Sequence, residues 1–81
     1  MMTCIARNTE NRLKKVIKGS VKCFANGNRI YCDIKTCNLS HRITIQYTAQ
    51  EVSTGIASSE RTTELILRLY KKYLHDLFFK C

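Results

Sequence analysis

The apolar positions near the start of the chain recur at helical spacing and predict a first helix near residues 9–18. The stripe of i, i+3 and i+4 positions consists of Leu13, Val16 and Ile17. Asn8 or Thr9 would cap this helix, because a short polar side chain at that place accepts a hydrogen bond from a free amide of the first turn. Glu10 would lie in the first turn, and Gly19 would end the helix.

Strict alternation of apolar and polar residues then predicts two strands that flank the sequence Asn-Gly-Asn at 26–28. Two turns are open. A Gly27-Asn28 turn sets aromatic against aromatic and lysine against aspartate across the strands, whereas an Asn26-Gly27 turn loses both pairs. We therefore favour the first register. Its pairs are Val21 with Ile34, Lys22 with Asp33, Cys23 with Cys32, Phe24 with Tyr31, and Ala25 with Ile30.

A third strand is predicted at 42–48, where Arg-Ile-Thr-Ile-Gln-Tyr-Thr alternates without a break. Ile43, Ile45 and Tyr47 share one face of it, and residues 36–41 would be the loop that leads into it.

A long second helix is predicted after the third strand. Thr48 and Glu51 have capping-box spacing that would start one short turn first, and Ser58 or Ser59 would cap the long helix. Its apolar face would contain Ile66, Leu69, Tyr70, Tyr73, Leu74 and Leu77. Its polar face would contain Glu64, Arg68, Lys71, Lys72 and His75.

The order of these elements predicts an α+β fold. Three strands with one apolar face require both helices on that face, which gives a two-layer αβββα domain with a three-stranded antiparallel sheet. A chain of 81 residues leaves no room for a second core, so residues 1–81 would form a single domain.

The distribution of charge points to a polyanionic partner. The chain has 14 Lys and Arg against 6 Asp and Glu, a formal charge of +8. The excess lies in residues 1–42, with nine basic and two acidic groups. A positive surface of this kind is typical of proteins that bind nucleic acid or an acidic protein surface.

The predicted binding residues fall into two groups. The first helix would present Arg7, Arg12, Lys14, Lys15 and Lys18. The sheet face turned away from the helices would present Lys22, Phe24, Arg29, Tyr31, Lys35 and Arg42. The cations would neutralise phosphates and the rings would stack on bases. Two structural interpretations stay open: the rings form only a cross-strand pair, and the cations only keep the two surfaces solvated.

The helix, three strands and helix, with a basic first helix, resemble the double-stranded RNA-binding domain over nearly the whole chain. In that family a glycine-containing loop leads into the second helix, whose first cations grip phosphates. Gly55 and the serines at 58–59 match this loop; Glu60 stands where the family has a cation, and Arg61 is the cation that the segment offers. The resemblance implies RNA binding through the first helix, the turn at 26–29 and Arg61.

The cysteines allow three interpretations. The spacing C-x8-C-x4-C-x3-H is similar to that of Cys-Cys-Cys-His zinc fingers, which bind single-stranded RNA, and its ligands would be Cys23, Cys32, Cys37 and His41. Alternatively, Cys23 and Cys32 fill core volume as free thiols, or they form a cross-strand disulfide. An odd total of five cysteines, and a start without the apolar run of a signal peptide, favour free thiols in a reducing compartment.

No group of residues supports catalysis. Ser40, His41 and Cys37 are neighbours in sequence, and such neighbours rarely meet in catalytic geometry. The acids, which show no paired spacing, are Asp33, Glu51, Glu60, Glu64 and Asp76.

We therefore predict a small, basic, non-catalytic nucleic-acid-binding domain of the cytoplasm, with RNA favoured and no cofactor. The alternative is a protein-interaction or inhibitor module, for example from a virus or mobile element, that docks on an acidic protein surface. No membrane span is predicted, because no apolar run approaches about 18 residues. A homodimer could cover apolar residues outside the main stripe of the second helix, which are Leu67, Phe78 and Phe79.

Overall fold

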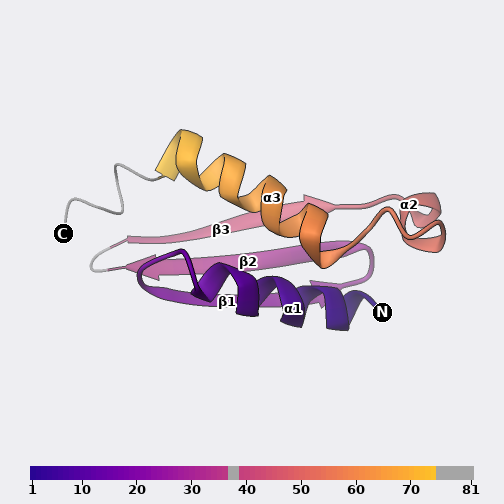
Figure 1. The fold of residues 1–81 in the computed structure, drawn as a ribbon, viewed down its shortest axis with the longest axis horizontal. Helices are drawn as coiled ribbons and strands as arrows, with labels where there is room; N and C mark the ends of the chain where they lie inside the picture. Colours follow the sequence, from indigo (N-terminus) through magenta and orange to yellow (C-terminus); the bar gives the residue numbers. More distant parts are fainter. Residues whose placement is uncertain (37–38, 75–81) are drawn as a thin grey trace.

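The computed structural model of the chain describes residues 1–36 and 39–74 and confirms the α+β fold. Its elements are α1 (Met2–Lys14), β1 (Ser20–Asn26), β2 (Arg29–Thr36), β3 (Leu39–Gln46), α2 (Ala49–Ser53), α3 (Ser59–Leu69) and one π-helical turn, η1 (Tyr70–Leu74). The strands form one antiparallel sheet in the order β1-β2-β3. Helices α1 and α3 lie side by side over one face of it (Figure 1). None of the described helices is long and apolar enough to cross a bilayer.

The hairpin has the register that the cross-strand pairs favoured. Cys23 lies opposite Cys32 and Phe24 opposite Tyr31, with Gly27 and Asn28 as the two turn residues. Gly27 has a φ of 61°, which a residue without a side chain adopts at little cost.

The third strand begins three residues earlier than its sequence pattern predicted. Thr36 pairs with Leu39 and Ile34 with His41, so the expected loop at 36–41 was wrong and β2 and β3 continue through most of it. Ser40 and His41 hid this, because both are exposed and the polar His41 takes an inner-face position opposite Ile34, where the apolar alternation breaks. Ile43, Ile45 and Tyr47 are buried as expected.

The first helix was predicted too late in the chain. It begins at Met2, because Ile5 and Ala6 extend the apolar face toward the N-terminus, and Thr9 lies inside the helix as a buried residue rather than as its cap. Leu13 and Ile17 are in the core, but Val16 is 61% exposed, so its assignment to the core was wrong. The helix ends at Lys14, and Val16 therefore lies outside the helical stripe.

The two later helices are capped as predicted. Thr48 and Glu51 form a reciprocal capping box at α2, in which Thr48 Oγ1 accepts from the Glu51 amide at 3.1 Å and Glu51 Oε1 accepts from the Thr48 amide at 2.8 Å. Ser58 caps α3 by accepting a hydrogen bond from the Arg61 amide at 3.1 Å. Leu67 is half-buried against the core, while Phe78 and Phe79 lie outside the described residues.

The core lies between the inner face of the sheet and the two helices. Its most deeply buried side chains are Leu13, Val21, Ile30, Ile34 and Ile66. One polar contact joins β3 to α3 inside it: Thr62 Oγ1 donates to the Ser58 carbonyl at 2.6 Å and therefore accepts the hydrogen of the Tyr47 hydroxyl at 2.7 Å.

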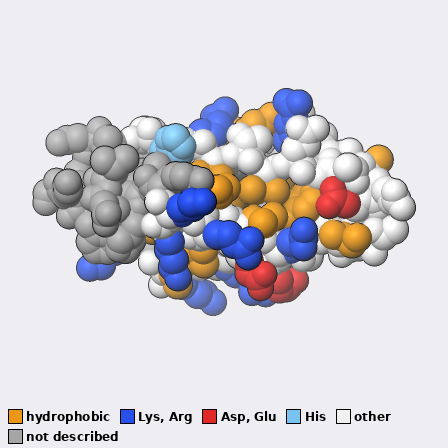
Figure 2. All heavy atoms as spheres, turned by 90° about the horizontal axis from the view of Figure 1, so that it is seen from above, with side chains coloured by type: hydrophobic (Ala, Val, Ile, Leu, Met, Phe, Trp, Pro, Cys, Tyr) orange, Lys and Arg blue, Asp and Glu red, His pale blue; other side chains and the backbone are white. Residues whose placement is uncertain are grey.

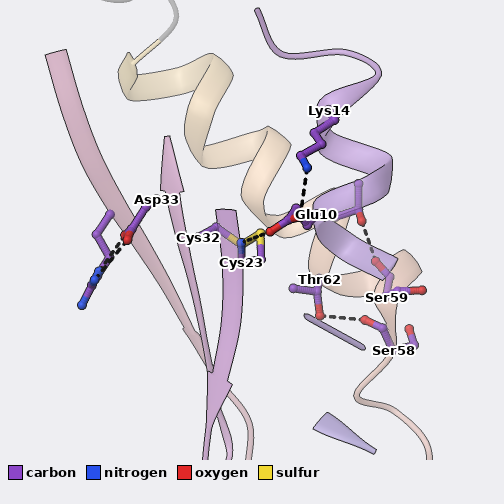
Figure 3. The surroundings of a disulfide bond; sticks show 10 residues. Glu10, Lys14, Cys23, Cys32, Asp33, Ser58, Ser59 and Thr62 are labelled. Atoms are coloured by element: carbon purple, nitrogen blue, oxygen red, sulfur yellow. Dashed lines mark hydrogen bonds and ion pairs between the residues drawn. A yellow bond between two sulfur atoms is a disulfide. The ribbon is translucent and has the colours of Figure 1, made fainter. Parts of the chain in front are cut away.

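Cys23 and Cys32 form a disulfide on the inner face of the sheet (Figure 3). The expectation of free thiols was wrong at these two positions. Cross-strand rungs alternate between wide and narrow, and the Cys23–Cys32 rung, with 4.1 Å between Cα atoms, is a narrow one on which the two Sγ atoms meet.

Candidate nucleic-acid interface

None of the described helices lies over the outer face of the sheet, which carries a stacked aromatic pair. Phe24 on β1 and Tyr31 on β2 lie on the same rung, with ring centroids 5.2 Å apart and ring planes 24° from parallel. Phe24 is 43% exposed and Tyr31 is half-buried. Because strand side chains alternate between faces, these rings point away from the core, as the alternation predicted.

The guanidinium of Arg42 on β3 lies over both rings of this pair. Its guanidinium carbon lies 5.1 Å from the Phe24 ring centre and 5.3 Å from that of Tyr31, within cation–π range. The same guanidinium holds the Asp33 carboxylate in a two-pronged contact, with Nε–Oδ1 at 2.7 Å and a second nitrogen–Oδ2 contact at 3.1 Å. This hydrogen bonding lowers the pKa of Asp33, so the acid stays ionised and occupies Arg42.

The outer face remains positive after that pair is formed. Lys22, Arg29 and Lys35 project from the same face, are exposed, and form no ion pair among residues 1–36 and 39–74. Four cations against one acid leave this face with a formal charge of +3. All six outer-face residues predicted from the sequence therefore lie on one surface.

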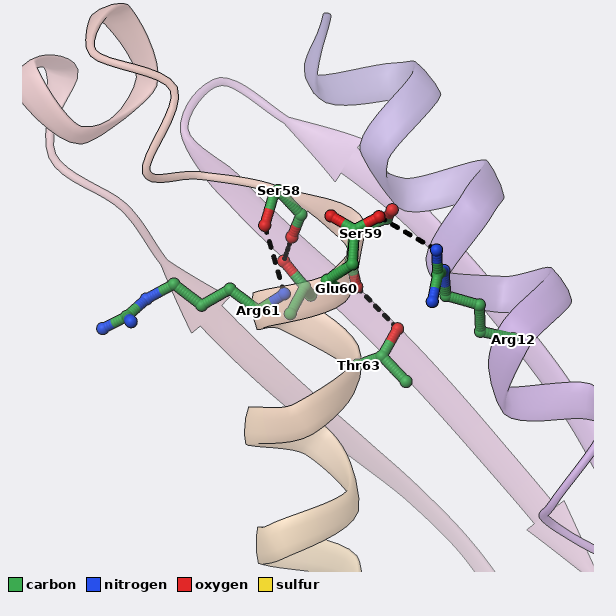
Figure 4. Close-up of polar contacts among 7 residues, drawn as sticks. Arg12, Ser58, Ser59, Glu60, Arg61 and Thr63 are labelled. Carbon is green, nitrogen blue, oxygen red and sulfur yellow. Dashed lines mark hydrogen bonds and ion pairs between the residues drawn. The ribbon is translucent and has the colours of Figure 1, made fainter.

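The cations of α1 lie in the other layer, and two of them are engaged by acids. Arg12 binds Glu60 of α3 at 2.9 Å (Figure 4). Lys14 binds Glu10 at 3.1 Å, one helical turn away. Glu60, which stands where the resemblance predicted a cation, therefore fastens α3 to α1.

Glu10 also joins α1 to the sheet. Its Oε1 accepts a hydrogen bond of 2.8 Å from the backbone amide of Cys23, which points away from β2 because β1 is an edge strand (Figure 3). That hydrogen bond, with Lys14 beside the carboxylate, lowers the pKa of Glu10 below its ordinary value. The contact satisfies one amide of the open edge and closes this part of it to other strands.

The remaining predicted cations lie on the helical layer and not on the outer face of the sheet. Arg7, Lys15 and Lys18 are exposed on α1 and the segment after it, and Arg61 is exposed on α3. Figure 2 shows Lys and Arg side chains on opposite margins of the molecule, with hydrophobic side chains between them. The predicted binding residues thus separate into an outer-face set and a helical set.

Two of the cysteines considered as zinc ligands are not available to bind the ion. Cys23 and Cys32 are bonded to each other, so neither offers a thiolate, and Cys37 lies outside the described residues. His41 is exposed near the open end of β3. Among the described residues, no three or more His, Cys, Asp or Glu side chains are placed to hold a metal ion.

Two amide side chains of the outer face, Asn26 and Gln46, were missed. Asn26, Arg29 and Gln46 form the last rung of the face, beside the turn. Only Arg29 had been singled out, although the alternation that assigned Phe24 and Tyr31 to this face assigns the two amides to it as well. Together with Asn28 they border a hollow of about 350 Å³.

Comparison of the chain with protein-family models, with curated proteins and with solved structures finds no match. The αβββα order agrees with the predicted resemblance to the double-stranded RNA-binding domain, but no finding identifies the chain as a member, so that resemblance stays a prediction.

Proposed function

We propose that the protein binds single-stranded nucleic acid, RNA in the first place, through the outer face of its sheet. The observation that carries the proposal is the stacked Phe24–Tyr31 pair on a helix-free face with a formal charge of +3. Aromatic rings on a strand surface offer stacking platforms to unpaired bases, and the cations beside them neutralise phosphates.

A single strand suits this face better than a duplex. Bases inside a duplex are already stacked on one another, whereas those of a single strand can spread over exposed rings. Duplex binding by the first helix would use its cations. Two of these cations, Arg12 and Lys14, already form ion pairs with Glu60 and Glu10. The proposed binding surface is therefore the outer face of the sheet and not the first helix.

The first test is binding of a fluorescent oligouridine of about ten nucleotides, measured by anisotropy over a range of salt concentrations. With Lys22, Arg29 and Lys35 as phosphate contacts, the slope of log K against log salt should be roughly −2, since each contact to a single strand contributes about −0.7. Lys22→Gln with Lys35→Gln should bring the slope to roughly −0.7. Arg68→Gln with Lys71→Gln, exposed cations of α3 and η1, is the matched control and should leave it unchanged.

The second test separates stacking from charge. Phe24→Ala should weaken binding by about 1–3 kcal/mol, which is the contribution of one base stacked on an aromatic ring. Val16→Ala truncates an apolar side chain outside the face that is more exposed than Phe24, at 61% against 43%, and should have no effect. If the Phe24 variant binds as tightly as the wild type, stacking on this face is excluded.

An acidic protein surface is the competing partner, since its negative charge would also complement the charge of +3 on the outer face. That partner would bind without nucleic acid and would depend on Lys22 and Lys35 but little on the exposed ring of Phe24. Absence of any salt-dependent binding to oligonucleotides, together with retention of an acidic protein after nuclease treatment, would replace the proposed function with this one.

A further inference from the structure

The hollow at the turn end of the outer face has the size and lining of a small-ligand site. Its volume of about 350 Å³ lies at the lower end of the range of such sites, about 300–1,000 Å³. It is lined by Asn26, Gly27, Asn28, Arg29, Tyr31, Gln46 and Tyr47.

The polar side chains around the hollow are free to bind a ligand. Asn26, Arg29 and Gln46 lie next to one another on β1, β2 and β3, because Arg29 pairs with Asn26 on one side and with Gln46 on the other. These side chains and that of Asn28 are exposed and form no hydrogen bond or ion pair within the described part of the chain. The backbone carbonyl of Asn28 accepts a hydrogen bond from the Tyr47 amide at 2.9 Å.

The donors and acceptors of this lining complement one base better than the other three. The guanidinium of Arg29 has paired N–H donors, which match the O6 and N7 acceptors of guanine. The amide oxygens of Asn26, Asn28 and Gln46 are acceptors for its ring N–H and amino group. Adenine carries an amino donor where guanine carries O6, and the pyrimidines have no N7.

We propose that this hollow selects guanine in a single-stranded ligand. The proposal rests on the proposed function, because the strand must first be held on the outer face. Tyr31 connects the two sites: its ring stacks with Phe24 and also borders the hollow. Since Arg29 and Tyr31 are two residues apart on β2, their side chains leave the same face about 7 Å from each other. One nucleotide would stack on the aromatic pair while its neighbour enters the hollow.

The test compares an eight-nucleotide oligouridine with the same oligonucleotide carrying one central guanosine, or one central adenosine, at fixed salt. The wild type should bind the guanosine oligonucleotide about tenfold more tightly than the other two, as expected for one good bidentate contact. Arg29→Lys keeps a positive charge but removes the fork, so it should reduce the affinity for the guanosine oligonucleotide to that for oligouridine. Arg68→Lys, the same change on α3, should keep the preference. Asn26→Ala with Gln46→Ala should reduce the preference while oligouridine binding stays as in the wild type.

The outcomes separate the two proposals. Equal affinity of the wild type for all three oligonucleotides, with a salt slope of roughly −2, overturns guanine selection and leaves the proposed function standing. A guanine preference that survives in both the Arg29→Lys and the double amide variant overturns the assignment to this hollow. Absence of oligonucleotide binding overturns the proposed function and guanine selection with it. Circular dichroism spectra that match the wild type confirm that each variant is folded.

Discussion

Two buried threonines should respond in opposite directions to the same substitution. Thr9 of α1 is fully buried, and its hydroxyl has no hydrogen-bond partner among the residues that the structure describes. Thr62 of α3 is equally buried, but its hydroxyl donates to the Ser58 carbonyl and accepts from the Tyr47 hydroxyl. Valine has nearly the shape of threonine, so replacing either residue changes the hydrogen bonding and little else.

The expected magnitudes follow from these contacts. A buried polar group without a partner costs about 1–3 kcal/mol, so Thr9→Val should raise the free energy of unfolding by about 1 kcal/mol. Thr62→Val removes two hydrogen bonds and leaves the hydroxyl of Tyr47, which is 3% exposed, without a partner. It should lower the free energy of unfolding by about 2 kcal/mol. In a domain of this size the two midpoints of thermal unfolding should then differ by about 12–24 °C.

The assay is urea and thermal unfolding followed by circular dichroism at pH 7 without reductant, so that the disulfide stays intact. The urea dependence of the unfolding free energy should be the same in the wild type and both variants, because neither change alters the surface that unfolding exposes. If both variants are destabilised, the hydroxyl of Thr9 has a partner after all. If Thr62→Val is neutral, the hydrogen bond between Tyr47 and α3 contributes nothing to stability.

Three further predictions concern the elements that hold the sheet. Reduction of Cys23–Cys32, whose separation in sequence is 9 residues, should lower the free energy of unfolding by about 2 kcal/mol, and a Cys23→Ala/Cys32→Ala variant should be insensitive to reductant in denaturant titrations. Glu10→Gln should cost about 1 kcal/mol at pH 7, unlike Glu64→Gln on the exposed face of α3. Since the pKa of Glu10 is lowered in the folded state, this difference should be complete above pH 4.5, the ordinary value, and should vanish as pH falls through the lowered pKa. Gly19→Ala should lower the free energy of unfolding, measured in urea, by more than about 1 kcal/mol, because Gly19 has a φ of 122°.

The hairpin and its faces could be predicted because they depend on local rules. Alternation fixes which side chains share a face, and a two-residue turn fixes the register, so the pairing of Phe24 with Tyr31 followed from the sequence alone. The same reasoning would have assigned Asn26 and Gln46 to the outer face. They were missed because only charged and aromatic side chains were taken as binding residues, and an amide is neither charged nor aromatic.

The disulfide was predicted incorrectly because composition was weighed above geometry. The favoured register already placed Cys23 opposite Cys32, but an odd number of cysteines argued for thiols. Which rung of a hairpin is narrow depends on the turn, and a two-residue turn makes the Cys23–Cys32 rung narrow. The start of the first helix was missed for a different reason: Ile5, Ala6 and Leu13 follow helical spacing, but the polar Thr9 lies between them and was interpreted as a cap.

The placement of a few acids decides which cations are available to a ligand. A count of charges treats the cations of residues 1–42 as equivalent, but Glu10 and Glu60 both lie in the helical layer, where they bind Lys14 and Arg12. The outer face has Asp33 as its one acid, and that acid is held by Arg42. Since Glu60 is 48 residues from Arg12 in sequence, only the fold brings this pair together. The outer face is therefore left with three cations, Lys22, Arg29 and Lys35, that form no ion pair among the described residues, beside the pair of Phe24 and Tyr31.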